Sequence, residues 1–196
     1  ILKSLARNEA SPIGYDTIVK DIAEYENESD LVENRKTVAD YIKVLDSLYL
    51  TLNQEAYSIN YRSSKRIGKS AKRHLVDPSL SCALLDLSVD KLMHDFNTFG
   101  LMFEALVERD LRIYMDYLDG HLYHFRDNTS GDEVDAILEF KSGEYGAVEI
   151  KLNYRSIEEA KESLLKFYNN VSKKPKFMCI IVGNYSAIIK DEETGI

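Results

Sequence analysis

The chain has 196 residues, 44% of them apolar, and a formal net charge of −8. This length and composition suffice for one large hydrophobic core or two small ones. The acidic balance argues against a protein that coats nucleic acid through general positive charge. No apolar run approaches the roughly 20 residues of a membrane span. The two cysteines, Cys82 and Cys179, are far apart and fit no metal or redox spacing, so a reduced cytoplasmic protein is expected.

The first half of the chain has the pattern of three helices followed by two short strands. Apolar residues recur at helical spacing over residues 1–7, 15–25 and 34–48, and strands are predicted at 48–52 and 55–60. Three helices and a hairpin are the outline of a winged helix, in which the third helix reads DNA. Arg35 and Lys36 at the start of that helix would then contact DNA. The alternative is that they only solvate a helix end.

A basic run at residues 62–73 contains six Lys or Arg residues and no acidic residue. We interpret it as a solvated linker that contacts phosphate or an acidic partner. Its tripeptide 68–70 resembles the end of a P-loop, but Ser63 stands where that loop needs glycine, so ATP binding is not expected here. The predicted nucleic-acid contacts of the run are Arg62, Lys65, Arg66, Lys69, Lys72 and Arg73.

The second half of the chain has the pattern of an α/β sandwich with a mixed sheet. A short strand at 76–80 and a small helix to residue 87 precede a long helix predicted over 89–117. Three strands follow between residues 126 and 151, then a helix at 156–171 that opens with a capping-box pattern. The continuous apolar run 177–182 predicts a strand that is buried on both faces. Helix, three strands, helix and strand are the elements of an α/β layer architecture.

Three ionisable residues, Asp135, Glu149 and Lys151, interrupt the apolar strands of this half. Such groups are costly unless they serve one another, water or a metal. Glu149 and Lys151 are two residues apart on a strand and therefore share a face. If Asp135 faces the same side from the neighbouring strand, the two carboxylates can bind Mg²⁺ or Mn²⁺. Lys151 could then polarise an attacking water and offset the charge on a phosphate. The alternative is a purely structural ion-pair network.

Together with Glu104 on the preceding helix, these residues resemble the metal site of the PD-(D/E)xK nuclease superfamily. In that superfamily an acidic residue on the first core helix, an Asp on a strand and a (D/E)xK motif on the next strand form the site. The resemblance implies a restriction-endonuclease-like fold, with Glu104, Asp135 and Glu149 as metal ligands and Lys151, Asp135 and Glu149 as catalytic residues. The Pro that precedes the Asp in the superfamily's name is replaced by Val134.

The whole chain also resembles the C-terminal region of a family of bacterial and archaeal AAA-type ATPases, which joins a winged-helix segment to a nuclease-like domain. The matching pieces are residues 35–38, 66–72, 76–77, 100–104 and 125–127. The resemblance implies a winged-helix-like domain with its linker at 1–85 and a nuclease-like domain at 86–196. It also implies an ATPase module of the same polypeptide that alone binds ATP. DNA and a second copy of the chain are further candidate partners. The chain opens without Met in a helical pattern, so we expect a piece of a longer polypeptide.

Two functions are therefore expected from the sequence. The first is a Mg²⁺-dependent DNA-processing module of an ATPase, or a remnant of one that has lost the reaction. The alternative is a non-catalytic module that docks the ATPase to a protein partner or to DNA.

Overall fold

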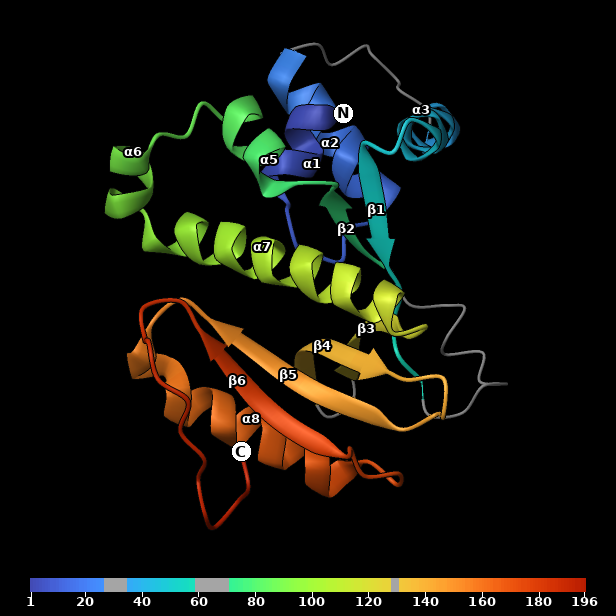
Figure 1. Cartoon of the computed structure of the whole chain (residues 1–196). Helices are drawn as coiled ribbons and strands as arrows, with labels where there is room; N and C mark the ends of the chain where they lie inside the picture. The colour runs from blue at the N-terminus through green and yellow to red at the C-terminus, as the bar shows by residue number, and fades with distance from the viewer. Residues whose placement is uncertain (27–34, 59–70, 128–130) are drawn as a thin grey trace. The chain divides into compact units, whose positions relative to one another are not determined.

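The computed structural model of the chain describes residues 1–26, 35–58, 71–127 and 131–196 (Figure 1). It confirms the predicted α/β class and the mixed sheet. The chain forms two compact units. The first contains the described residues of Ile1–Gln54 and Ser70–Ala105, and the second those of Glu55–Lys69 and Leu106–Ile196. The division into domains at 1–85 and 86–196 stays a prediction.

The first unit is built from short helices and one antiparallel pair of strands. Its elements are α1 (Leu2–Arg7), α2 (Tyr15–Glu26), α3 (Arg35–Ser47), β1 (Thr51–Gln54), β2 (Lys72–Leu75), α5 (Pro78–Leu84) and α6 (Val89–His94). Strands β1 and β2 pair antiparallel, with Thr51 opposite Leu75. The helices bury the apolar stripes that the sequence predicts, in a core of Leu5, Ala6, Ile13, Ile18, Val38, Ile42 and Leu75.

The second hairpin strand was predicted wrongly at residues 55–60. The strand that pairs with β1 is β2, which lies at the end of the basic run. Residues 55–57 instead bond to the backbone of His124. The Tyr57 N–H donates to the His124 carbonyl (2.6 Å), and the His124 N–H donates to the Glu55 carbonyl (3.0 Å). Tyr57 is thereby buried in the core of the second unit, which explains the diversion. Residues 59–60 lie outside the described residues.

The long helix predicted over residues 89–117 is two helices, α6 and α7 (Phe96–Tyr117). Asp95 separates them with non-helical backbone angles (φ −129°, ψ 82°). Its carboxylate accepts hydrogen bonds from the Thr98 N–H (3.1 Å) and hydroxyl (2.6 Å), as an N-cap does. Helix periodicity alone carries no sign of such a cap. No helix in the described part of the chain is long and apolar enough to cross a membrane.

The second unit contains a four-stranded sheet with the order β3-β4-β5-β6. Its strands are β3 (His121–Asp127), β4 (Asp132–Glu139), β5 (Tyr145–Lys151) and β6 (Phe177–Val182). Strand β4 pairs antiparallel with both β3 and β5, and β6 pairs parallel with β5. A short 3-10 turn η1 (Tyr154–Ser156) leads into α8 (Ile157–Asn170), which crosses one face of the sheet (Figure 1). Between α8 and the sheet lies a core of Tyr57, Val134, Ile137, Tyr145, Ala147, Leu164, Phe167 and Val171.

Two details of this unit differ from the prediction. Strand β6 is last in the strand order and its residues are only half-buried or exposed, so the run 177–182 is not a strand buried on both faces. The capping box predicted at Ser156 does not form, because its side chain makes no capping hydrogen bond and the η1 turn precedes the helix.

Candidate functional site

A β-bulge in β4 positions the first site residue. Tyr123 pairs with Ile137 and Phe125 with Val134, so Asp135 and Ala136 together lie opposite the single residue His124. Bulges bend a strand and redirect its side chains, and they are common next to functional sites. The extra residue in β4 is therefore the local cause of the unusual position of Asp135.

Asp135 lies where β4 and β5 separate. The regular pairs of these strands run from Glu139 with Tyr145 to Ala136 with Val148 and end there. Beyond that point the N–H of Ile150 donates to the Asp135 carboxylate (Oδ2, 2.8 Å) instead of to a backbone carbonyl. A side chain thus replaces a ladder hydrogen bond, and this bond fixes the orientation of the carboxylate of Asp135, whose side chain is only 12% exposed.

The three charges predicted to cluster do lie together. Lys151 Nζ is 2.7 Å from Glu149 Oε2 and 3.5 Å from Asp135 Oδ2. The Glu149 carboxylate is buried on the side of the sheet covered by α8, where Ser163 Oγ lies 3.3 Å from its Oε1. Lys151 is the more exposed member, with 27% of its side chain accessible. Solvent therefore reaches the cluster from the Lys151 side.

The electrostatics of the cluster favour an additional positive charge. Burial and the negative charge of Asp135 raise the pKa of Glu149 from 4.5 to about 7, although the Lys151 ammonium acts in the opposite direction. Desolvation is the largest of these causes. Two carboxylates share one ammonium, so a cation that binds them would lower the cost of ionising Glu149.

The donor set suits a hard divalent cation. Carboxylate oxygens, completed by water, are the ligands that Mg²⁺ and Mn²⁺ prefer. Asp135 and Glu149 supply two such groups, and Mg²⁺ is commonly held by one or two carboxylates and its substrate. Among the described residues, no group of three or more His, Cys, Asp or Glu side chains is arranged to hold a metal ion. The metal and catalytic roles of Asp135, Glu149 and Lys151 stay predictions.

Glu104, the predicted third carboxylate, lies in the first unit on α7. Its Oε1 accepts a hydrogen bond from Lys72 Nζ at 2.7 Å. Lys72 is 2% exposed, so it belongs to a buried strand and not to the solvated linker that the basic run predicted. Its Nζ would have to leave Glu104 to reach a phosphate. The metal-binding role of Glu104 and the nucleic-acid contact of Lys72 stay predictions.

Of the other residues predicted to contact nucleic acid, three lie in the described part of the chain: Arg35, Lys36 and Arg73. Arg35 and Lys36 are exposed at the start of α3, where Arg35 Nε lies 3.7 Å from Asp16 Oδ1. Arg73 donates to the Asn53 side chain (3.0 Å) and its guanidinium stacks over the Tyr15 ring at 4.8 Å. Four further basic residues lie outside the described residues: Arg62, Lys65, Arg66 and Lys69.

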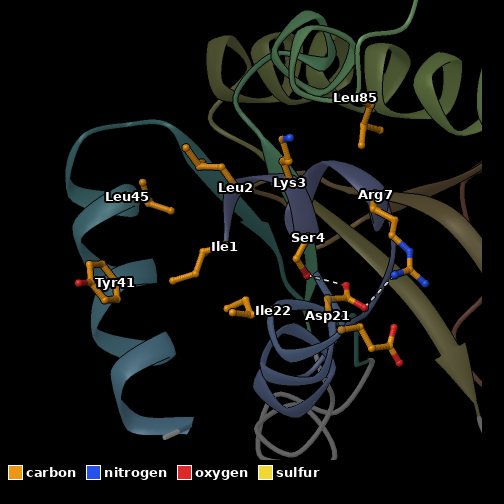
Figure 2. Close-up of a pocket in the computed structure, with 11 residues that line it drawn as sticks. Ile1, Leu2, Lys3, Ser4, Arg7, Asp21, Ile22, Tyr41, Leu45 and Leu85 are labelled. Carbon is orange, nitrogen blue, oxygen red and sulfur yellow. Dashed lines mark hydrogen bonds and ion pairs between the residues drawn. The ribbon is translucent and has the colours of Figure 1, made fainter. Parts of the chain in front are cut away.

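The first unit has an apolar pocket of about 840 Å³ that the sequence did not indicate (Figure 2). Its apolar wall is formed by Ile1, Leu2, Ile22, Tyr41, Leu45 and Leu85. On one side Asp21 accepts hydrogen bonds from Ser4 (2.7 Å) and Arg7 (3.0 Å). The Asp21 carboxylate is thus already paired, and the pocket offers mainly shape and apolar surface.

Sequence reasoning also missed Ser163 and a stacked pair of tyrosines, Tyr154 and Tyr185. Ser163 lies on α8, and only the packing of that helix on β5 brings its hydroxyl to Glu149. Tyr154 follows β5 and Tyr185 follows β6. The parallel pairing of these strands could have placed the two rings at one edge of the sheet, but it requires knowledge of the strand order.

Comparisons with known families divide the chain in two. Residues 99–194 match a family model described as a domain of unknown function (DUF4143), and residues 1–91 match another described as a domain of unknown function (DUF8612). Neither description names a nuclease or a winged helix. Comparisons with curated proteins and with solved structures gave no match. The two parts of the chain are thus each similar to a separate family.

Proposed function

We propose that the second unit hydrolyses phosphodiester bonds of DNA with Mg²⁺ or Mn²⁺ at Asp135, Glu149 and Lys151. One observation carries the proposal: two buried carboxylates from adjacent strands converge on one ammonium where those strands separate. A sheet that only needed stability would gain more from apolar residues there, because buried ion pairs seldom repay their desolvation. Charges at this position therefore favour a chemical role.

Each side chain has a distinct task in this proposal. Asp135, held by the Ile150 N–H, and Glu149, beside Ser163, supply oxygen ligands. The cation, when bound, would acidify a coordinated water and offset charge on the phosphate. The Lys151 ammonium, displaced from the two carboxylates, would contact a phosphate oxygen and stabilise the negative charge that grows there. The resemblance to PD-(D/E)xK nucleases supports this assignment of roles.

We place this activity in an ATPase-linked protein. The family that matches residues 99–194 is known as an ATPase-associated region, which supports the resemblance stated above. In this proposal the partner is an ATPase module of the same polypeptide, which would bind ATP. The exposed Arg35 and Lys36 of α3 would add a DNA contact in the first unit.

A second candidate function is a non-catalytic docking module of the same ATPase. The observation that favours it is the short contact of Lys151 with Glu149, because one ammonium together with a proton on Glu149 neutralises the site without a metal. In that case the cluster is a structural ion-pair network, and DNA or a protein partner is bound elsewhere on the surface.

Cleavage assays with plasmid and linear DNA separate the two functions. In Mg²⁺ or Mn²⁺ the chain should cut DNA, and Asp135→Ala and Lys151→Ala should each reduce the rate by roughly a hundredfold or more. Glu133→Ala is the matched control, because this carboxylate lies on the same strand, is 43% exposed and faces Arg126. Equal cleavage by the wild type and Asp135→Ala would contradict the proposal, as would no cleavage in either metal.

A further inference from the structure

Two tyrosines stack on each other beside the candidate site. The ring centroids of Tyr154 and Tyr185 are 4.9 Å apart, with an angle of 30° between the ring planes. The two residues remain 50% and 41% exposed. Stacked aromatic rings in a core contribute stability by burial, but this pair leaves about half of its surface in water. About half of the surface of each residue is therefore accessible to a further planar group.

Hydrogen bonds hold the two loops that carry these rings. The loops follow β5 and β6, whose last paired residues are Lys151 and Val182. The N–H of Gly183 donates to the Lys151 carbonyl (3.0 Å), and the N–H of Tyr154 donates to the Asn184 side chain (2.9 Å). The backbones of the two loops are therefore tied to each other at the edge of the sheet where Lys151 ends its strand.

We infer that Tyr154 and Tyr185 form a stacking platform for an unpaired base of a single-stranded nucleic acid. This inference rests on the proposed function and names its substrate class. Every base has a planar face that stacks on an aromatic ring, whereas the bases of an intact duplex are covered by their neighbours. A base stacked at this edge would bring its own backbone next to Lys151 and the two carboxylates.

The charges around the platform favour stacking over a broad electrostatic contact. Arg155 is exposed next to Tyr154, and its backbone N–H is held by the Asn153 side chain (3.0 Å). It can contact one phosphate. Glu158 and Glu159, exposed in the first turn of α8, oppose a longer run of phosphates. Affinity should therefore depend on unpaired bases and fall only weakly with salt.

Fluorescence anisotropy with a labelled oligothymidylate tests the platform. The titration is done in EDTA, so that binding is measured without cleavage. Tyr154→Ala and Tyr185→Ala should each weaken binding by about tenfold, the cost of losing one stacking partner. The Phe variants should bind like the wild type because the ring is retained. Tyr117→Ala is the matched control, because Tyr117 is an 89% exposed tyrosine on another element, at the end of α7.

The outcomes separate the platform from the proposed hydrolysis. If both Ala variants lose affinity for the oligonucleotide while Tyr117→Ala does not, the platform is supported. That conclusion holds even if the wild-type chain does not cut DNA. If Asp135→Ala abolishes cleavage but the Tyr variants bind the oligonucleotide as the wild type does, the platform is wrong and the hydrolysis stands. Absence of single-strand binding by the wild type would also overturn the platform and leave the exposed rings to a protein partner.

Discussion

At the scale of single residues, the Glu149 carboxyl is the most informative group. It is 3% exposed and lies between Lys151 and Ser163. Burial and the charge of Asp135 raise its pKa to about 7, so the folded protein holds a proton that the unfolded chain releases near pH 4.5. The free energy of unfolding must therefore depend on pH through this group.

Glu149→Gln should remove this pH dependence. Between pH 4.5 and 7 the folded wild type binds more protons than the unfolded chain, so the contribution of Glu149 to stability is lost as the pH rises. The glutamine side chain at position 149 does not titrate. Its stability relative to the wild type should rise across this range by about 3 kcal/mol. Urea unfolding at a series of pH values measures the difference.

The control for that measurement is Glu159→Gln, an exposed carboxyl in the first turn of α8. This variant removes a carboxyl but leaves the cluster of Asp135, Glu149 and Lys151 intact. A constant difference for Glu149→Gln between pH 4.5 and 7 would show that the carboxyl is ionised as readily in the folded as in the unfolded chain.

Part of this site could be predicted from sequence. Strand alternation placed Glu149 and Lys151 on one face, and the 2.7 Å contact confirms it. The bond from Ile150 to Asp135 could not be predicted, because it depends on a bulge set by the pairing of β4 with β3. Glu104 shows the other limit: its apolar neighbours predicted a helix but not its partner Lys72.

At the scale of elements, α7 and the turn that follows it carry two glycines with opposite roles. Gly100 lies inside α7, where an added Cβ would meet no atom within 4 Å. Gly120 follows the helix, and there an added Cβ would lie 2.8 Å from the Glu139 carbonyl oxygen and 2.3 Å from Met115 Cε. A methionine side chain can move, but the backbone of β4 cannot do so cheaply.

Substitution by alanine should therefore have opposite signs at the two positions. Gly100→Ala should stabilise the protein by about 1 kcal/mol, because alanine loses less conformational entropy in a helix. Gly120→Ala should destabilise it by about 1–3 kcal/mol through overpacking. Chemical denaturation measures both, and each variant serves as the control for the other. Changes of the same sign would show that this account of the turn is wrong.

Most elements could be predicted because their signals are local. The apolar stripes of α2, α3 and α8 and the alternation in β4 and β5 arise from neighbouring residues. The partner of β1 could not be predicted, since residues 55–57 leave the hairpin to bury Tyr57 and to bond His124. The break at Asp95 depends on one side-chain cap and leaves the apolar periodicity intact.

At the scale of the whole molecule, two units each have their own core. The family match at residues 1–91 covers most of the first unit, and the match at residues 99–194 covers most of the second. The predicted boundary at residues 85–86 came from the order of the predicted elements and from the family resemblance. In the structure, the residues of α7 up to Ala105 belong to the first unit and the residues from Leu106 onward to the second. A continuous helix hides such a change, because its periodicity does not reveal which core each turn contacts.

The net charge of −8 belongs to this scale as well. It weakens non-specific attraction to DNA, so any activity on DNA should depend on a bound cation and on specific contacts. The central claim is accordingly that Asp135 and Glu149 bind a divalent cation and do not merely form an ion-pair network with Lys151.

Calorimetric titration of Mn²⁺ tests this claim most directly. The wild-type chain should bind one ion per chain, more weakly below pH 7 as Glu149 takes up its proton, and Asp135→Asn should abolish the binding. Glu133→Gln, on the same strand, should bind as the wild type does. No heat of binding in the wild type, or the same affinity in Asp135→Asn, would contradict the account and leave the cluster as a structural ion-pair network.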